Sequence, residues 1–177
     1  MNYEDLHTSA LEKLFGSIDL RIIRQDEDIR IIQLNDKNEI SRTLGVVRFL
    51  NIESKQLKIA HDKILEGGLL GKTLLDLDID FDKEFIGKLQ VKLPDWLKKD
   101  FNTQQDTSLA FFSKILVRTN SLSDRNLLYA ELVEIIPPEL TDVFVDKTKS
   151  LSKIDDNLLS LLKVVGITEI NLRKNYD

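Results

Sequence analysis

Two apolar runs, 111–118 and 127–136, are joined by a polar link rich in Ser, Asn and Asp. Runs of this length bounded by turn-forming residues predict two antiparallel strands. Pro137 and Pro138 follow the second run, and because proline has no N–H to donate, the strand must end there or reach a sheet edge. Glu131 lies inside the second run, so this carboxylate among apolar residues needs a structural or chemical reason.

The rest of the chain predicts an α+β fold. Apolar residues three to four positions apart favour helices at 3–15, 82–89, 94–101 and 152–165, the last capped by Ser152. β-branched or alternating runs favour strands at 18–24, 29–34, 43–52, 57–65, 76–82 and 167–172. We expect an antiparallel sheet with helices packed on one side, in a single domain of leading helix (1–16), core (17–140) and C-terminal helical extension (141–177).

Composition excludes several classes of site. The 177 residues carry a net charge of −5, no cysteine, and two histidines, His7 and His61. Absence of cysteine excludes disulfides, thiolate nucleophiles and thiolate metal sites. The sequence has neither a Walker loop nor a GxGxxG motif, so we expect no metal and no cofactor. The negative charge argues against a nucleic-acid partner, and no apolar run is long enough to span a membrane.

The N-terminal residues are acidic and amphipathic, unlike a secretory signal. We therefore expect a soluble, cytoplasmic protein. Its oligomeric state is left open by the sequence.

Charged residues within the predicted strands are the candidates for function. Arg21, Arg24 and Arg30, in the first predicted hairpin, are expected to be solvated. Arg48, in contrast, lies inside an apolar run, as Glu131 does.

The hairpin expected at 46–69 echoes the hairpin at 114–140. Each has a strand with a cation, a polar turn and a returning strand with a central alanine. If the echo is a structural repeat, Arg48, His61 and Glu131 would approach one cavity. Between the two hairpins, the glycine-rich segment 66–75 either makes a simple turn or offers backbone N–H groups to an anion.

The order of these features resembles the chorismate pyruvate-lyase family and its fold relatives, the UTRA domains of bacterial regulators. The resemblance is carried by VVRFL at 46–50, the return strand at 57–65, LLGKTL at 69–74, DFDKEFIG at 80–87, FFSKILVR at 111–118 and LLYAELVEIIP at 127–137. These segments cover residues 18 to 140 in unbroken order. The order of the set supports the resemblance, since no single motif is specific.

The resemblance implies a largely enclosed site in which chorismate loses pyruvate to leave 4-hydroxybenzoate. Arg48 would bind the ring carboxylate, because a guanidinium matches a carboxylate bidentately. The backbone around Leu70 and Gly71 would support it. Glu131 would lie near the ring oxygen and transfer a proton, since burial raises the pKa of a carboxyl group.

The sequence also departs from the family pattern. The family's return strand carries a further arginine followed by a proline, whereas this chain has His61, Asp62 and Lys63. Lys63 or Lys114 would have to supply the missing cation, and His61 is a further candidate for binding substrate.

Two hypotheses follow from the sequence. One is a chorismate-lyase-like carbon–oxygen lyase that supplies an aromatic precursor. The other is a non-catalytic, UTRA-like domain that binds a small molecule. Both expect a small aromatic or carboxylate ligand.

Overall fold

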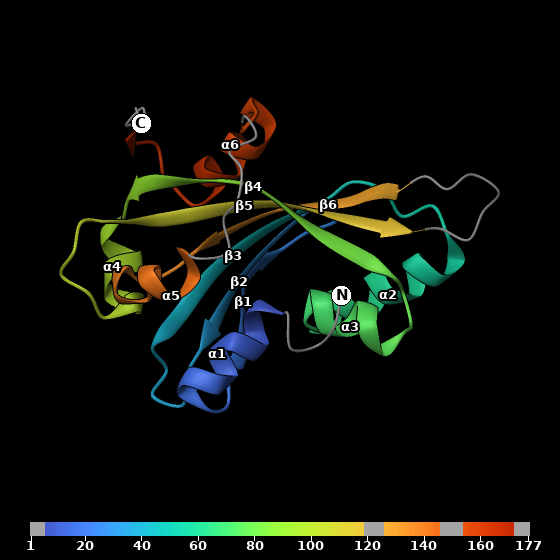
Figure 1. The fold of residues 1–177 in the computed structure, drawn as a ribbon, viewed down its shortest axis with the longest axis horizontal. Coiled ribbons are helices and arrows are strands. Elements are labelled where there is room, and N and C mark those ends of the chain that lie inside the picture. The colour runs from blue at the N-terminus through green and yellow to red at the C-terminus, as the bar shows by residue number, and fades with distance from the viewer. Residues whose placement is uncertain (1–5, 119–125, 146–153, 172–177) are drawn as a thin grey trace.

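A computed structural model describes residues 6–118, 126–145 and 154–171 (Figure 1). Among these residues the centre is a seven-stranded antiparallel sheet with the order β1-β2-β3-β6-β5-β4-β7. Its strands are β1 (Asp19–Gln25), β2 (Ile29–Asn35), β3 (Ser41–Phe49), β4 (Phe81–Lys92), β5 (Thr107–Arg118), β6 (Asn126–Ile135) and β7 (Ile170–Asn171). The predicted α+β class and antiparallel sheet are confirmed.

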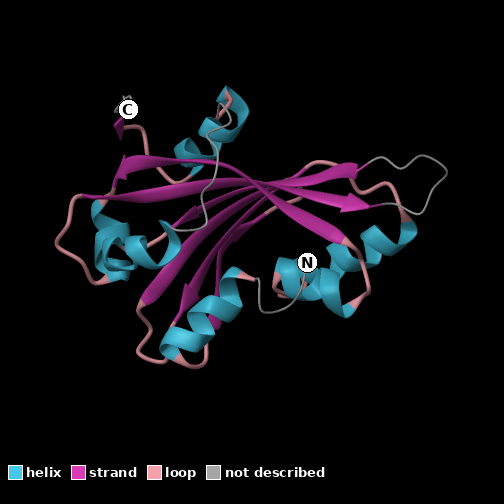
Figure 2. Ribbon diagram, viewed as in Figure 1, coloured by secondary structure: helices cyan, strands magenta, loops and turns pink. Residues whose placement is uncertain are grey.

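Short helices surround the sheet (Figure 2). They are α1 (His7–Phe15), α2 (Lys55–Leu65), α3 (Leu70–Asp76), α4 (Asp95–Phe101), a 3₁₀ turn (Pro138–Leu140), α5 (Thr141–Val145) and α6 (Asp156–Val164). Within the described ranges, none of these helices has the length and apolar character needed to cross a membrane.

The sheet is covered on both faces. Val46 and Val47 are neighbours on β3 but belong to different hydrophobic clusters, because successive strand residues point to opposite faces. The cluster around Val46 includes residues of α4 and α6, and the cluster around Val47 includes residues of α2 and α3. In Figure 1, α6 lies above the sheet, and α1, α2 and α3 lie below it. The expected one-sided packing is therefore correct only in part.

The central hairpin is formed as predicted. β5 and β6 pair antiparallel, with Phe111 opposite Glu134 and Lys114 opposite Glu131. β6 also pairs with β3, which makes it an interior strand of the sheet. It ends at Ile135, two residues before Pro137. The proline therefore follows the strand and removes no ladder hydrogen bond.

The return strand predicted at 57–65 is wrong, since these residues form α2. Leu57, Ala60 and Ile64 are buried at helical spacing, which gives the segment one apolar face. The Ser54 side chain caps the helix by accepting a hydrogen bond from the Leu57 N–H at 3.0 Å. The first of the two echoed hairpins does not exist, so the proposed structural repeat is wrong as well.

The helix predicted at 82–89 is part of β4. A bulge between Phe85 and Gly87 shifts the register against β5. Such a bulge interrupts the alternation of apolar residues, and the interrupted pattern resembled helical spacing. The strand predicted at 76–82 is also wrong, because α3 ends at Asp76 and β4 begins only at Phe81.

The helices at the two ends of the described chain are confirmed with shorter bounds. α1 ends before Gly16, whose φ of 82° suits glycine. α6 is capped by Asp155, whose carboxylate accepts from the Leu158 N–H at 2.9 Å. Ser152, the predicted cap, lies outside the described residues.

Candidate functional site

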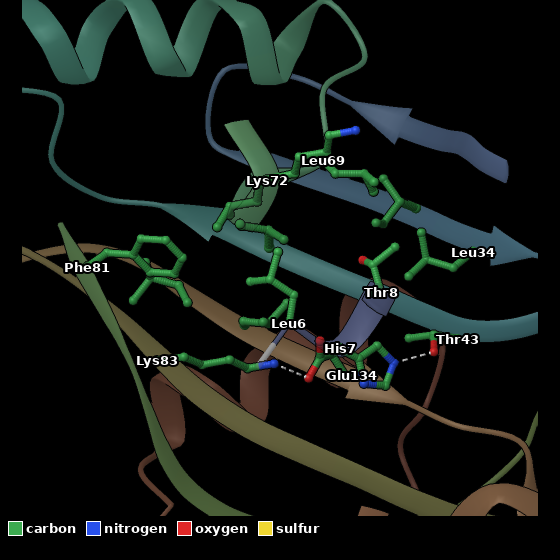
Figure 3. Close-up of a pocket in the computed structure, with 17 residues that line it drawn as sticks. Leu6, His7, Thr8, Leu34, Thr43, Leu69, Lys72, Phe81, Lys83 and Glu134 are labelled. Carbon is green, nitrogen blue, oxygen red and sulfur yellow. Dashed lines mark hydrogen bonds and ion pairs between the residues drawn. The ribbon is translucent and has the colours of Figure 1, made fainter. Parts of the chain in front are cut away.

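A cavity of about 90 Å³ lies on the face of the sheet that carries α1 and α3 (Figure 3). Its floor comes from β2, β3, β4, β5 and β6, and its walls come from the starts of the two helices. Most of the lining is apolar. The polar lining residues are His7, Thr8, Thr43, Lys72, Lys83 and Glu134.

Two glycines make room for this cavity. Gly45 lies on β3 opposite Ile32, and a Cβ added there would come within 3.1 Å of the Ile32 side chain. Gly71 lies in the first turn of α3, where an added Cβ would come within 2.7 Å of Leu6. The absence of side chains at these positions leaves space over the sheet and lets α3 pack closely on the segment before α1. Leu70 and Gly71, which the family resemblance pointed to, both line the cavity.

Two polar contacts are built into the wall. Lys83 Nζ lies 2.6 Å from Glu134 Oε2, and His7 Nε2 lies 2.6 Å from Thr43 Oγ1 (Figure 3). The Lys83 and Glu134 side chains are 24% and 13% exposed. An ion pair this sheltered is screened by water less than a surface pair, so it is a strong local feature of the cavity.

Arg30 is the buried cation nearest in register to this cavity. It lies opposite Val47 and two residues from Ile32 on the same strand face, and both of these residues line the cavity. The residue is only 2% exposed, and it is not among the residues that line the cavity. Its Nη1 donates to the Gly68 carbonyl oxygen at 2.7 Å, while Nε and Nη2 have no hydrogen-bond partner among the described residues.

Burial makes this arrangement of Arg30 costly. Burial lowers the pKa of Arg30, because removal from water disfavours the charged form. Buried N–H groups that lack a partner also cost free energy. Nε and Nη2 point the same way on a guanidinium and bind the two oxygens of one carboxylate.

His61 belongs to a neighbouring buried cluster beneath α2. Its Nδ1 lies 3.0 Å from the Tyr129 hydroxyl, and its ring meets Phe49 edge-on with centroids 4.5 Å apart. Burial lowers the pKa of His61, partly opposed by the charge of Asp62. Burial raises the pKa of Tyr129, and the charge of Arg30 opposes this. His61 does not line the cavity.

The lowered pKa of His61 predicts a pH dependence of stability. As pH falls through about 6.5, the unfolded chain binds a proton at this residue before the folded protein does. The free energy of unfolding should therefore be fully present above that pH and decline below it, by up to about 1.4 kcal/mol per pH unit. Urea titrations between pH 5 and 7.5 should show a smaller decline for His61→Leu than for the wild type. Identical pH profiles for the two proteins would contradict this.

Arg48 and Glu131 lie on the opposite face of the sheet. Arg48 Nη2 lies 2.6 Å from Glu131 Oε2, and the same guanidinium donates to the Asn157 carbonyl at 2.6 Å and to Ser160 Oγ at 3.3 Å. Lys114, opposite Glu131 in register, lies 3.6 Å from Asp155. These contacts join α6 to the sheet.

The structure thus separates the residues that the sequence grouped. Arg48, Glu131 and Lys114 meet beneath α6, His61 lies beneath α2, and Leu70 and Gly71 line the cavity. Lys63, the other proposed substitute for the missing arginine, is exposed on α2.

Sequence reasoning missed Arg30 and Glu134. Arg30 is predicted to be solvated, but the structure buries it. Ile32 and Leu34 follow it at a spacing of two, which predicts that all three residues lie on one apolar face of the strand. Glu134 lies three residues after Glu131 and therefore points to the other face of β6.

Comparison with models of known protein families gives no match for this chain, and comparison with curated proteins gives no significant match.

Proposed function

We propose that the cavity binds a small cyclic carboxylic acid, and that the protein is a chorismate-lyase-like enzyme that eliminates pyruvate from chorismate to leave 4-hydroxybenzoate. The observation that carries the proposal is the buried Arg30 guanidinium, with Nε and Nη2 unpaired among the described residues. Arg30 does not itself line the cavity, so a carboxylate must displace part of the wall to reach Nε and Nη2. There it would supply the missing hydrogen bonds and neutralise the charge.

The spacing of the polar groups suits a ligand with one ring. Arg30 is in register with Val47 and Leu132, and Ile32 is in register with Gly45 and Glu134. Arg30 and Glu134 are thus two strands and two residues apart, which puts their backbones roughly 12 Å apart at usual strand spacing. A ligand held by both side chains would have to fit within this separation. Gly45, which has no side chain, lies between them.

The proposed reaction is a balanced elimination. The ether bond to the enolpyruvyl group breaks, its electron pair leaves on that oxygen, and the ring loses a proton and becomes aromatic. The released enolpyruvate gains a proton on carbon to become pyruvate. All atoms come from chorismate, so no oxidant or co-substrate is needed. Arg30 would hold the ring carboxylate, and Glu134 would accept a hydrogen bond from the ring hydroxyl and serve in proton transfer.

A non-catalytic carboxylate-binding domain is the second candidate. The cavity of about 90 Å³ is smaller than the engineered cavity of about 150 Å³ that accommodates benzene, so a ring must displace part of the wall. Chorismate also brings a second carboxylate. Lys83 is already paired with Glu134. Among the residues that line the cavity, the exposed Lys72 would therefore have to pair with the second carboxylate. The product 4-hydroxybenzoate has a single carboxylate and so needs no second cation.

A turnover assay separates the two candidates. With chorismate, we expect pyruvate and 4-hydroxybenzoate in equal amounts, and Glu134→Gln should lower kcat about 10²-fold or more with a smaller change in KM. Glu84→Gln, at an exposed position of β4, is the matched control. No product above the protein-free rate would reject the lyase. A rise in melting temperature with 4-hydroxybenzoate but no turnover would then support the binding domain.

A further inference from the structure

The Lys83–Glu134 ion pair reaches across a whole strand. Lys83 lies on β4 opposite Ile115 of β5, and Glu134 lies on β6 opposite Phe111 of β5. The lysine side chain therefore crosses over β5 and runs along it to place Nζ 2.6 Å from Glu134 Oε2. Figure 3 shows it extended along the cavity wall toward the carboxylate.

Stability alone does not account for this pair. Moving two charges into a mainly apolar cavity costs desolvation energy that their attraction only partly recovers. Extending a lysine side chain into one conformation also costs entropy. Replacement of such a pair by apolar residues of similar volume is often neutral or stabilising. A charged carboxylate held at a ligand cavity points to a role toward the ligand.

We propose that Lys83 is a positioning residue, which holds Glu134 through Oε2 as a fixed, charged hydrogen-bond acceptor and so selects a cyclic carboxylic acid with a hydroxyl group opposite its ring carboxylate. This rests on the proposed function, in which the cavity is the ligand site. A carboxylate or an ether in place of that hydroxyl has no proton to donate to Glu134. A ring hydroxyl donates directly to the carboxylate.

The ratio of the affinities for 4-hydroxybenzoate and benzoate measures this selection. In isothermal titration calorimetry we expect the wild type to bind 4-hydroxybenzoate about 10- to 100-fold more tightly, as one hydrogen bond to a charged group allows. Lys83→Met should reduce the ratio to less than about threefold while the benzoate affinity changes little. Lys83→Arg, which keeps the cation, should restore most of the ratio. Lys92→Met, at an exposed position of the same strand, is the control.

Each outcome decides the proposal. A Lys83→Met protein that keeps the wild-type ratio would overturn it, as would a Lys83→Arg protein no better than Lys83→Met. The double variant Lys83→Met/Glu134→Leu should be at least as stable as the wild type, and a large drop in its melting temperature would show that the pair is structural. If the wild type binds neither acid, the proposed function fails and the role of Lys83 with it. Tight binding of both acids at a ratio near one overturns the role of Lys83 alone.

Discussion

We expect Arg30→Met to weaken binding of 4-hydroxybenzoate by a factor of about 30 or more and to leave the protein about as stable as the wild type. The ligand would lose a bidentate, desolvated partner, and truncation of such a group commonly costs 2 to 5 kcal/mol, which is a loss of about 30- to 5,000-fold in affinity. Removal of a buried charge with unpaired Nε and Nη2 should raise the free energy of unfolding. Loss of the hydrogen bond to the Gly68 carbonyl should lower it by about 1 kcal/mol.

Calorimetry with 4-hydroxybenzoate and urea denaturation of the same samples check both halves of this prediction. Arg21→Met, at an exposed position of β1 in the same hairpin, is the matched control and should change neither quantity. Unchanged affinity in Arg30→Met would remove Arg30 from the site. A large loss of stability would show that the guanidinium is structural.

Arg48→Met, the same substitution on the next strand, should have the opposite result. Glu131 is only 5% exposed, and without Arg48 its buried carboxylate loses the two hydrogen bonds that the guanidinium donates. Breaking one side of a sheltered ion pair costs about 3 kcal/mol or more. α6 would also lose the bonds from Arg48 to Asn157 and Ser160. We therefore expect a strongly lowered unfolding free energy with 4-hydroxybenzoate affinity unchanged.

The double variant Arg48→Met/Glu131→Leu controls for this effect. Replacing both charges by apolar residues removes the unpaired carboxylate and should recover most of the lost stability in urea titrations. If Arg48→Met instead weakens ligand binding at unchanged stability, the ligand site lies beneath α6, as the family resemblance first suggested.

Local pattern was enough to predict the central hairpin of the sheet. The apolar runs at 111–118 and 127–136 form the antiparallel pair β5–β6. This pair is predictable because a buried strand can be recognised from an apolar run with turn-forming residues at its ends. The segment 57–65 was read as a strand because it is short and partly β-branched. Ser54 before an apolar spacing of three and four was the overlooked helix signal.

The candidate site was harder to predict, because it depends on contacts between distant segments. Alternation along β6 shows that Glu131 and Glu134 face opposite ways, but not which face carries a cavity. That is decided by where α1, α3 and α6 pack. Gly71 meets Leu6 from 65 residues earlier in the chain, and Arg48 meets Asn157 from more than a hundred residues later. No local pattern encodes such pairings.

A crystal structure with 4-hydroxybenzoate tests the central claim most directly. The account predicts the ring in the cavity between β3 and α3, with both carboxylate oxygens about 2.7 to 2.9 Å from Nε and Nη2 of Arg30 and the hydroxyl donating to Glu134. A ligand bound beside Arg48 and Glu131, or one in the cavity with its carboxylate away from Arg30, would contradict it.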